Sequence, residues 1–117
     1  MTKIGILTCL HSNDVCARVG CLKEFMNRDA FFKDYSKDTA LAAMMTCNGC
    51  KSMNPTEPDE DKGILEKMDR LVSENIDIMH VGVCRLTDEK KECPRMTKIC
   101  KMIEDRGIQV VRGTHRE

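Results

Sequence analysis

Short apolar, β-branched segments alternate along this chain with longer segments whose apolar residues recur at helical spacing. A strand–helix–strand order requires a parallel sheet, because a helical crossover returns the chain to the start of the next strand. The pattern therefore predicts an α/β fold, a small three-layer Rossmann-like or flavodoxin-like domain with a four-stranded parallel sheet. The expected strands cover residues 3–8, 39–45, 76–83 and 108–111, and the expected helices cover residues 21–35, 58–72 and 93–106.

Proline and glycine indicate where the later helices begin and end. Pro58 is followed by three acidic residues, which predicts the first turn of the second helix, since proline fits position N1 and acids favour the positive end of the dipole. Cys93-Pro94 predicts the start of the third helix in the same way, and Gly107 predicts its end.

Length and charge limit the classes of protein to consider. The chain has 117 residues, so residues 1–117 are expected to form a single domain. Nineteen Lys plus Arg balance nineteen Asp plus Glu, which argues against nucleic acid or an anionic membrane as a partner. No run approaches the roughly 18 apolar residues of a transmembrane helix, and residues 1–10 lack the apolar stretch of a signal peptide. We therefore expect a cytoplasmic protein whose thiols stay reduced.

The segment Thr46-Cys47-Asn48-Gly49-Cys50 carries the clearest chemistry. Two thiols at this spacing can bind one metal ion or close one disulfide, and Asn-Gly predicts a tight turn with positive φ at both residues. A thioredoxin-like redox pair needs a helix to begin at the motif. The prolines at positions 55 and 58 follow too soon for that helix, so a metal site is favoured.

Other soft ligands follow the expected strands, and the carboxyl ends of parallel strands share one edge of a sheet. Further cysteines lie near expected helix starts, where thiolates are favoured. The predicted metal ligands are Cys9, Cys16, Cys21, Cys47, Cys50, Cys84, Cys93 and His115. By contrast, Cys100 lies on an apolar helix face and is expected to be a buried small hydrophobe, and His80 is expected to be a core histidine with a backbone partner.

These ligands predict a metal-binding protein that holds zinc through cysteine thiolates, with a metal ion as its partner. The alternative is a redox protein, either an iron–sulfur cluster carrier or a thiol-disulfide oxidoreductase, because the same cysteines suit both. Eight ligands allow one site or two, and no general base is evident. The loops over residues 9–21 and 47–58 are polar, and we expect them to be ordered chiefly by their thiolates.

The chain closely resembles the CGGC-domain family, small intracellular proteins that this resemblance implies bind a metal such as zinc. The resemblance covers nearly the whole length. It rests on Ile4-Gly5-Ile6-Leu7-Thr8-Cys9, Cys16 with Gly20-Cys21, the central C-x-G-C, His80-Val81-Gly82-Val83-Cys84, Cys93-Pro94 and the closing Val111-x-Gly113-Thr114-His115. One departure is Asn48, where the family pattern has glycine. Asparagine tolerates a left-handed conformation, so the turn is expected to survive.

Overall fold

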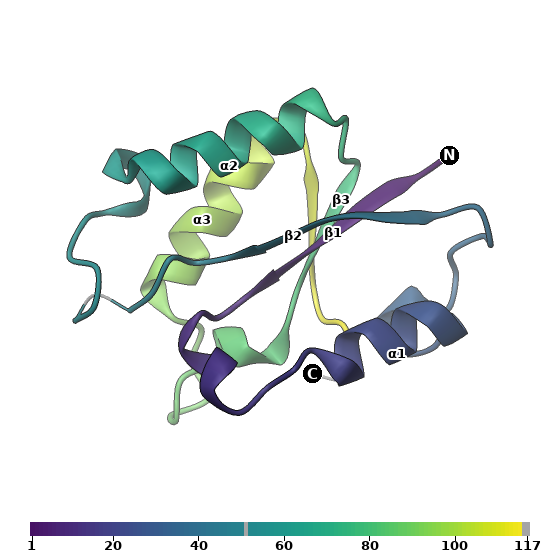
Figure 1. Cartoon of the computed structure of the whole chain (residues 1–117), viewed down its shortest axis with the longest axis horizontal. Coiled ribbons are helices and arrows are strands. Elements are labelled where there is room, and N and C mark those ends of the chain that lie inside the picture. Colours follow the sequence, from purple (N-terminus) through teal and green to yellow (C-terminus); the bar gives the residue numbers. More distant parts are fainter. Residues whose placement is uncertain (51, 116–117) are drawn as a thin grey trace.

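The strand–helix alternation is confirmed by the computed structural model, which describes residues 1–50 and 52–115. Its sheet is entirely parallel, with strand order β2-β1-β3-β4 (Figure 1). The elements are β1 (Lys3–Thr8), α1 (Val19–Asn27), β2 (Ala40–Thr46), α2 (Lys62–Ser73), β3 (Ile78–Val81), α3 (Pro94–Asp105) and β4 (Gln109–Arg112). Single 3-10 turns cover His11–Asp14, Ala30–Phe32, Pro58–Glu60 and Val83–Arg85.

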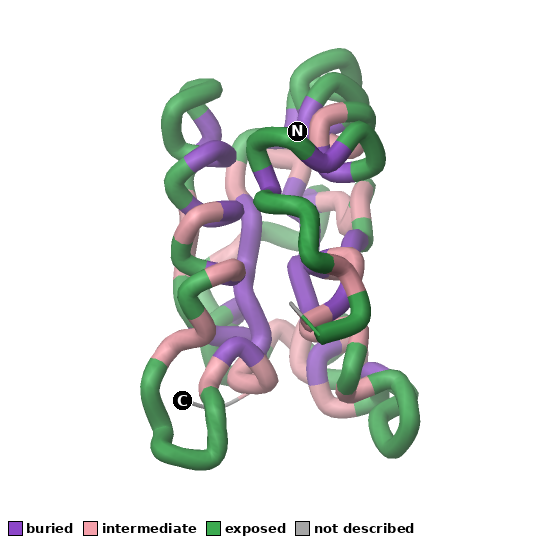
Figure 2. Tube along the Cα trace, turned by 90° about the vertical axis from the view of Figure 1, so that its left-hand side faces the viewer, coloured by how far each residue is buried: buried purple, intermediate pink, exposed green. Residues whose placement is uncertain are grey.

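The helices cover both faces of the sheet, with α1 on one side and α2 and α3 on the other (Figure 1). Ile4 and Ile6 of β1 pack with Phe32 on the α1 side. Leu7 and Met79 pack with the apolar faces of α2 and α3 on the other side. Buried residues accordingly concentrate in the middle layer and exposed ones on the outer surfaces of the helices (Figure 2). The three-layer prediction is thus confirmed, and the strand order is the one found in flavodoxin-like sheets.

The first helix is shorter than predicted. It begins at Val19 and ends at Asn27, so the expected helix over residues 21–35 is wrong in extent. The cause is Arg28, which takes a left-handed conformation with φ of 54°. Its guanidinium group donates hydrogen bonds to the carbonyls of Ser36 at 3.2 Å and Thr39 at 3.1 Å, which holds the chain in the turn. Residues beyond that turn form a separate 3-10 segment.

The second helix and the third strand also differ from the prediction in their bounds, and the second and fourth strands are shifted by one residue. The second helix begins at Lys62, because the Asp61 carboxylate caps it by accepting hydrogen bonds from the amides of Gly63 at 2.8 Å and Ile64 at 3.2 Å. Pro58 belongs instead to a separate 3-10 turn. The third strand ends at Val81, which leaves the next cysteine in a turn of its own. The third helix begins at the predicted proline.

No helix among the described residues is long and apolar enough to cross a membrane.

His80 is a core histidine with a backbone partner, as predicted. It is fully buried on the α1 side of the sheet, where its ring lies 4.5 Å from that of Phe32. Its Nδ1 lies 2.8 Å from the carbonyl oxygen of Gly113, which can only accept, so Nδ1 carries the proton. Its Nε2 therefore accepts from the Tyr35 hydroxyl at 2.6 Å. Burial lowers the pKa of His80, so the ring is held neutral.

This histidine makes the fold sensitive to acid. In the unfolded chain it takes up a proton near pH 6.5, whereas the folded chain resists protonation until lower pH. Its contribution to stability is therefore complete above about pH 6.5 and is lost as the pH falls toward the lowered pKa, with a slope of up to about 1.4 kcal/mol per pH unit. Urea unfolding at about pH 7.5 and 5.5 measures this loss. His80→Asn should show a shallower pH dependence, and an equal dependence in both proteins would contradict the assignment.

Candidate functional site

Three thiols lie side by side at the carboxyl edge of the sheet. Cys9 follows β1, Cys47 follows β2, and Cys84 lies in the turn after β3. Because β1 lies between β2 and β3, these cysteines form a continuous set, here called the thiol row. The chain crosses to one face of the sheet after β1 and to the other after β3, so the row occupies the topological switch point, where open α/β sheets bind their ligands.

Successive backbone amides after β1 donate hydrogen bonds to sulfurs of the thiol row. The amide of Cys9 donates to the sulfur of Cys84 at 3.1 Å, and the amide of Leu10 donates to the sulfur of Cys47 at 3.5 Å. These bonds run from β1 to both neighbouring strand ends. The turn after β1 therefore supplies positive partial charge to thiols on either side of it.

The Cys9 sulfur has amide partners of its own. Burial raises the pKa of its thiol, and the nearby sulfurs of Cys47 and Cys84 raise it further. The backbone amides of Ser12 and His11 donate to the same sulfur and oppose this shift. The amide hydrogen bonds to the sulfurs of Cys84 and Cys47 are of a kind that stabilises thiolates once their protons are displaced.

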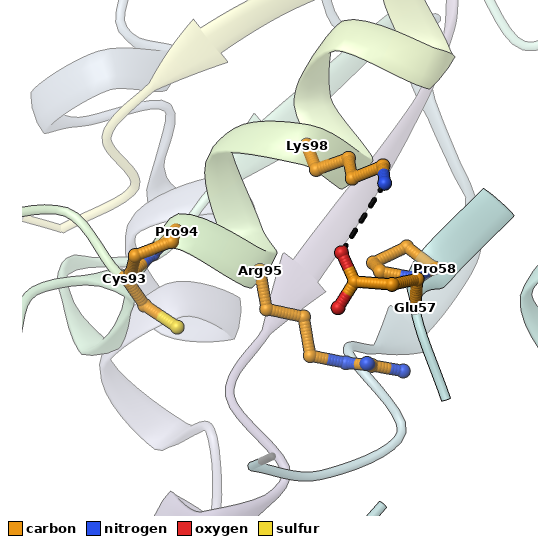
Figure 3. Close-up of a pocket in the computed structure, with 6 residues that line it drawn as sticks. All are labelled: Glu57, Pro58, Cys93, Pro94, Arg95 and Lys98. Carbon is orange, nitrogen blue, oxygen red and sulfur yellow. Dashed lines mark hydrogen bonds and ion pairs between the residues drawn. The ribbon is translucent and has the colours of Figure 1, made fainter. Parts of the chain in front are cut away.

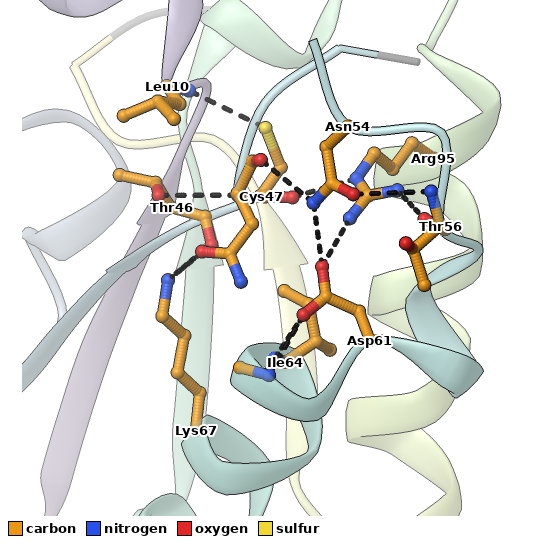
Figure 4. Close-up of polar contacts among 11 residues, drawn as sticks. Leu10, Thr46, Cys47, Asn54, Thr56, Asp61, Ile64, Lys67 and Arg95 are labelled. Carbon is orange, nitrogen blue, oxygen red and sulfur yellow. Dashed lines mark hydrogen bonds and ion pairs between the residues drawn. The ribbon is translucent and has the colours of Figure 1, made fainter.

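The Cys-Asn-Gly-Cys turn has the conformation that its sequence predicts. Asn48 has φ of 63° and Gly49 has φ of 102°, so both residues use positive φ as expected. The Lys67 ammonium donates to the carbonyl of Thr46 at 3.2 Å and to the side-chain oxygen of Asn48 (Figure 4). The side-chain amide of Asn54 donates to the Asn48 carbonyl at 3.1 Å. The asparagine that replaces the family glycine therefore anchors the turn to α2.

A buried guanidinium group holds the other side of this turn (Figure 4). Arg95 donates to the carbonyls of Cys47 at 2.8 Å and Thr56 at 2.6 Å, and to the Asp61 carboxylate at 3.0 Å. The side chain of Asn54 donates to the same carboxylate at 2.8 Å. Burial would raise the pKa of the Asp61 carboxyl, but hydrogen bonds from Asn54 and from the α2 amides of Ile64 and Gly63 lower it. Cys47, Asn54 and Thr56 are thus tied to the starts of α2 and α3.

Arg18 ties the backbone of the loop after β1 to neighbouring residues. It is buried and has φ of 65°. Its guanidinium group donates to the Thr8 hydroxyl at 3.0 Å and to the carbonyls of Cys9 at 3.0 Å and Cys16 at 3.1 Å, and also to the side chain of Asn13. The two loops therefore have contacts to the rest of the fold that do not involve thiolates, and their further ordering by metal-bound thiolates stays a prediction. Arginine side chains already join their backbones to neighbouring elements.

Cys21 and His115 form a separate group on the α1 side of the sheet. The Cys21 sulfur lies 3.1 Å from the Thr114 hydroxyl and 3.7 Å from Nδ1 of His115. The hydroxyl is also 3.1 Å from that nitrogen. Burial raises the pKa of the Cys21 thiol, so the expectation that the helix start favours its thiolate is wrong.

Three other predicted ligands are Cys16, Cys50 and Cys93. Among the described residues, they form no hydrogen bond with the thiol row or with the group of Cys21 and His115. Cys16 is exposed, and hydrogen bonds from Arg18 lower the pKa of its thiol. Cys50 is partly buried, and its carbonyl accepts amide hydrogens of the following turn. Cys93 precedes the first residue of α3, without a capping hydrogen bond from its side chain, and lines a pocket of about 310 Å³ beside Arg95 and Lys98 (Figure 3). Cys100 is fully buried as predicted, and burial raises the pKa of its thiol to about 11.

The sequence carried little signal for the arginine and lysine side chains that hold the site. Arg18, Lys67 and Arg95 bind backbone carbonyls of segments distant in the sequence, and no local pattern reveals such contacts. Asp61 was recognisable, because an aspartate directly before an apolar helical pattern is typical of a cap. Over the residues that the structure describes, no three Cys, His, Asp or Glu side chains already surround one point closely enough to hold a metal ion.

A family model described as the CGGC domain matches residues 3–115 of the chain. No curated protein and no solved structure matches it. The match includes every predicted ligand, from Cys9 to His115, and nearly all of the described structure.

Proposed function

The chain belongs to the CGGC-domain family, and from that membership we propose that it binds zinc through the thiol row at the carboxyl edge of the sheet. The family is consistent with a metal-binding role. The observation that carries the proposal is the pair of amide hydrogen bonds that the turn after β1 donates to the sulfurs of Cys84 and Cys47, on either side of Cys9. Amide donors to sulfur orient metal-binding thiolates and compensate their charge.

Nearby cations support the same function. The Lys67 ammonium binds the carbonyl that precedes Cys47, and the Arg95 guanidinium binds the carbonyl of Cys47 itself. Several thiolates around one zinc ion carry excess negative charge. The nearby positive groups of Lys67 and Arg95 offset this charge electrostatically. The site thus combines soft donors with fixed positive charge.

The donor chemistry fits zinc, which four thiolates hold in structural sites. We assign Cys9, Cys47 and Cys84 as ligands and Cys50 as the fourth, since two cysteines separated by a tight two-residue turn can bind one metal ion, and Asn48 and Gly49 both have positive φ. Ligation requires these side chains to rotate toward one ion, because they do not yet surround a single point. When bound, zinc would cross-link the segments that follow β1, β2 and β3.

The test compares metal binding in the reduced wild-type chain and two cysteine variants. We expect the wild type to bind about one equivalent of zinc tightly, and Cys47→Ser to lower its affinity at least about 100-fold, because a ligand and its charge are lost. Cys100→Ala is the matched control, since that sulfur lies on the buried face of α3 within the core, and it should bind zinc as the wild type does. Competition with a chromophoric chelator gives each affinity.

Two outcomes would overturn the proposal. Equal zinc affinity in Cys47→Ser and the wild type would show that the thiol row does not bind the zinc ion. A brown protein after anaerobic purification, absorbing near about 400 nm, would instead assign these cysteines to an iron–sulfur cluster.

A further inference from the structure

Cys21, Thr114 and His115 present three donor atoms to one another across two distant parts of the chain. Cys21 lies in the first turn of α1, and the other two residues follow β4. From their arrangement we infer a second metal site, in which the Cys21 sulfur and the His115 imidazole nitrogen together bind one divalent ion of the zinc, cobalt or nickel type. No part of this inference needs the thiol row to bind metal.

The separation of the two donors suits a shared ion. Zinc bonds of about 2.3 Å to sulfur and 2.0–2.1 Å to nitrogen, set at a tetrahedral angle, place the two ligand atoms roughly 3.5 Å apart. The sulfur of Cys21 and Nδ1 of His115 are 3.7 Å apart. An ion can therefore bind both donors with little movement of either side chain.

A hydroxyl group now links these donors. Thr114 Oγ1 lies 3.1 Å from both the Cys21 sulfur and Nδ1 of His115. A hydroxyl has one hydrogen to donate, so it can accept from the thiol while it donates to the imidazole. The Cys21 sulfur and Nδ1 of His115 thus both face the Thr114 hydroxyl. A bound ion would replace the thiol proton and release it to solvent.

The backbone around this group leaves room for the imidazole ring. A Cβ at Gly20 would lie 3.1 Å from two ring carbons of His115, a tight contact, so the backbone of α1 lies close against the imidazole ring. Thr114 is fully buried and Cys21 is 4% exposed, whereas His115 is partly exposed. An ion would therefore enter from the side of the imidazole.

The predicted site differs in chemistry from the thiol row. One sulfur and one imidazole leave coordination positions for water or a small external ligand, which is typical of open and not of structural zinc sites. Borderline divalent ions suit this mixture of donors. We expect weaker and more readily exchanged binding here than at the row.

Cobalt titration of the full reduced chain tests the inference. Paramagnetic Co²⁺ should shift and broaden the NMR signals of the His115 ring, and the second equivalent should add charge-transfer absorbance from a single thiolate. His115→Gln should weaken this second binding at least about tenfold, and Cys21→Ser should remove its thiolate absorbance. His11→Gln is the matched control, because that histidine is exposed at the same edge of the sheet.

The Cys47→Ser variant separates this inference from the proposed function. It should lose the tight equivalent and keep the binding that depends on His115. Loss of both together would show a single site and overturn the inference, as would unchanged His115 signals in the presence of cobalt. Binding at His115 with no tight equivalent in the wild type would overturn only the proposed function. Thermal melts of each variant confirm that it folds.

Discussion

Asp61→Ala is expected to lower the free energy of unfolding by about 3 kcal/mol, because it removes a helix cap and leaves a buried guanidinium group without its charge partner. The Asp61 and Arg95 side chains are 11% and 8% exposed, and their nitrogen and oxygen atoms lie 3.0 Å apart. The same carboxylate caps α2 through two backbone amides. Urea unfolding measures the loss.

Two further variants separate these contributions. Asp61→Asn can still cap the helix but carries no charge, so its stability should lie between those of the wild type and Asp61→Ala. Asp59→Ala removes a neighbouring acid whose side chain is 54% exposed and pairs only with Lys98 among the described residues, and it should change stability little. Equal losses for Asp59→Ala and Asp61→Ala would show that the buried network contributes nothing beyond surface charge.

Gly113→Ala is expected to cost about 3 kcal/mol, from backbone strain and overpacking together. The glycine has φ of 148°, a conformation that other residues rarely adopt, and an added Cβ would lie 2.5 Å from the ring of Phe31. Its amide donates to the Val81 carbonyl at 2.8 Å, and its own carbonyl accepts from His80, so the backbone cannot move aside freely.

Gly107→Ala is the matched control for this substitution. That glycine also has positive φ, at 82°, but a Cβ there would meet no described atom within 4 Å. Its replacement should cost about 1 kcal/mol, from the left-handed conformation alone. Thermal or urea unfolding compares the two. A Gly113→Ala protein no less stable than Gly107→Ala would mean that the Phe31 ring moves at no cost.

Local patterns predicted the fold because strand and helix periods are local properties. The first strand has the predicted bounds of residues 3–8, and the third helix begins at Pro94 after Cys93. The extent of the first helix was predicted wrongly, because the apolar periodicity of the sequence continues past residue 27 while the chain turns at Arg28. That turn depends on carbonyls eight to eleven residues away, which helical spacing cannot reveal.

The candidate site was predictable in part, for a related reason. Parallel topology places residues that follow strands at one edge, so Cys9, Cys47 and Cys84 were expected there. Which predicted ligands lie together depends on the strand order and on the face of the sheet that α1 covers. These two properties place Cys21 and His115 in a group separate from the thiol row. Neither property follows from local spacing.

X-ray absorption at the zinc edge, on reduced protein supplied with one equivalent of zinc, tests the proposed thiol row most directly. Ligation by the row predicts a first shell dominated by sulfur at about 2.3 Å. A shell of nitrogen and oxygen alone at about 2.0–2.2 Å would contradict it, as would reduced, folded protein that retains no zinc when zinc is supplied.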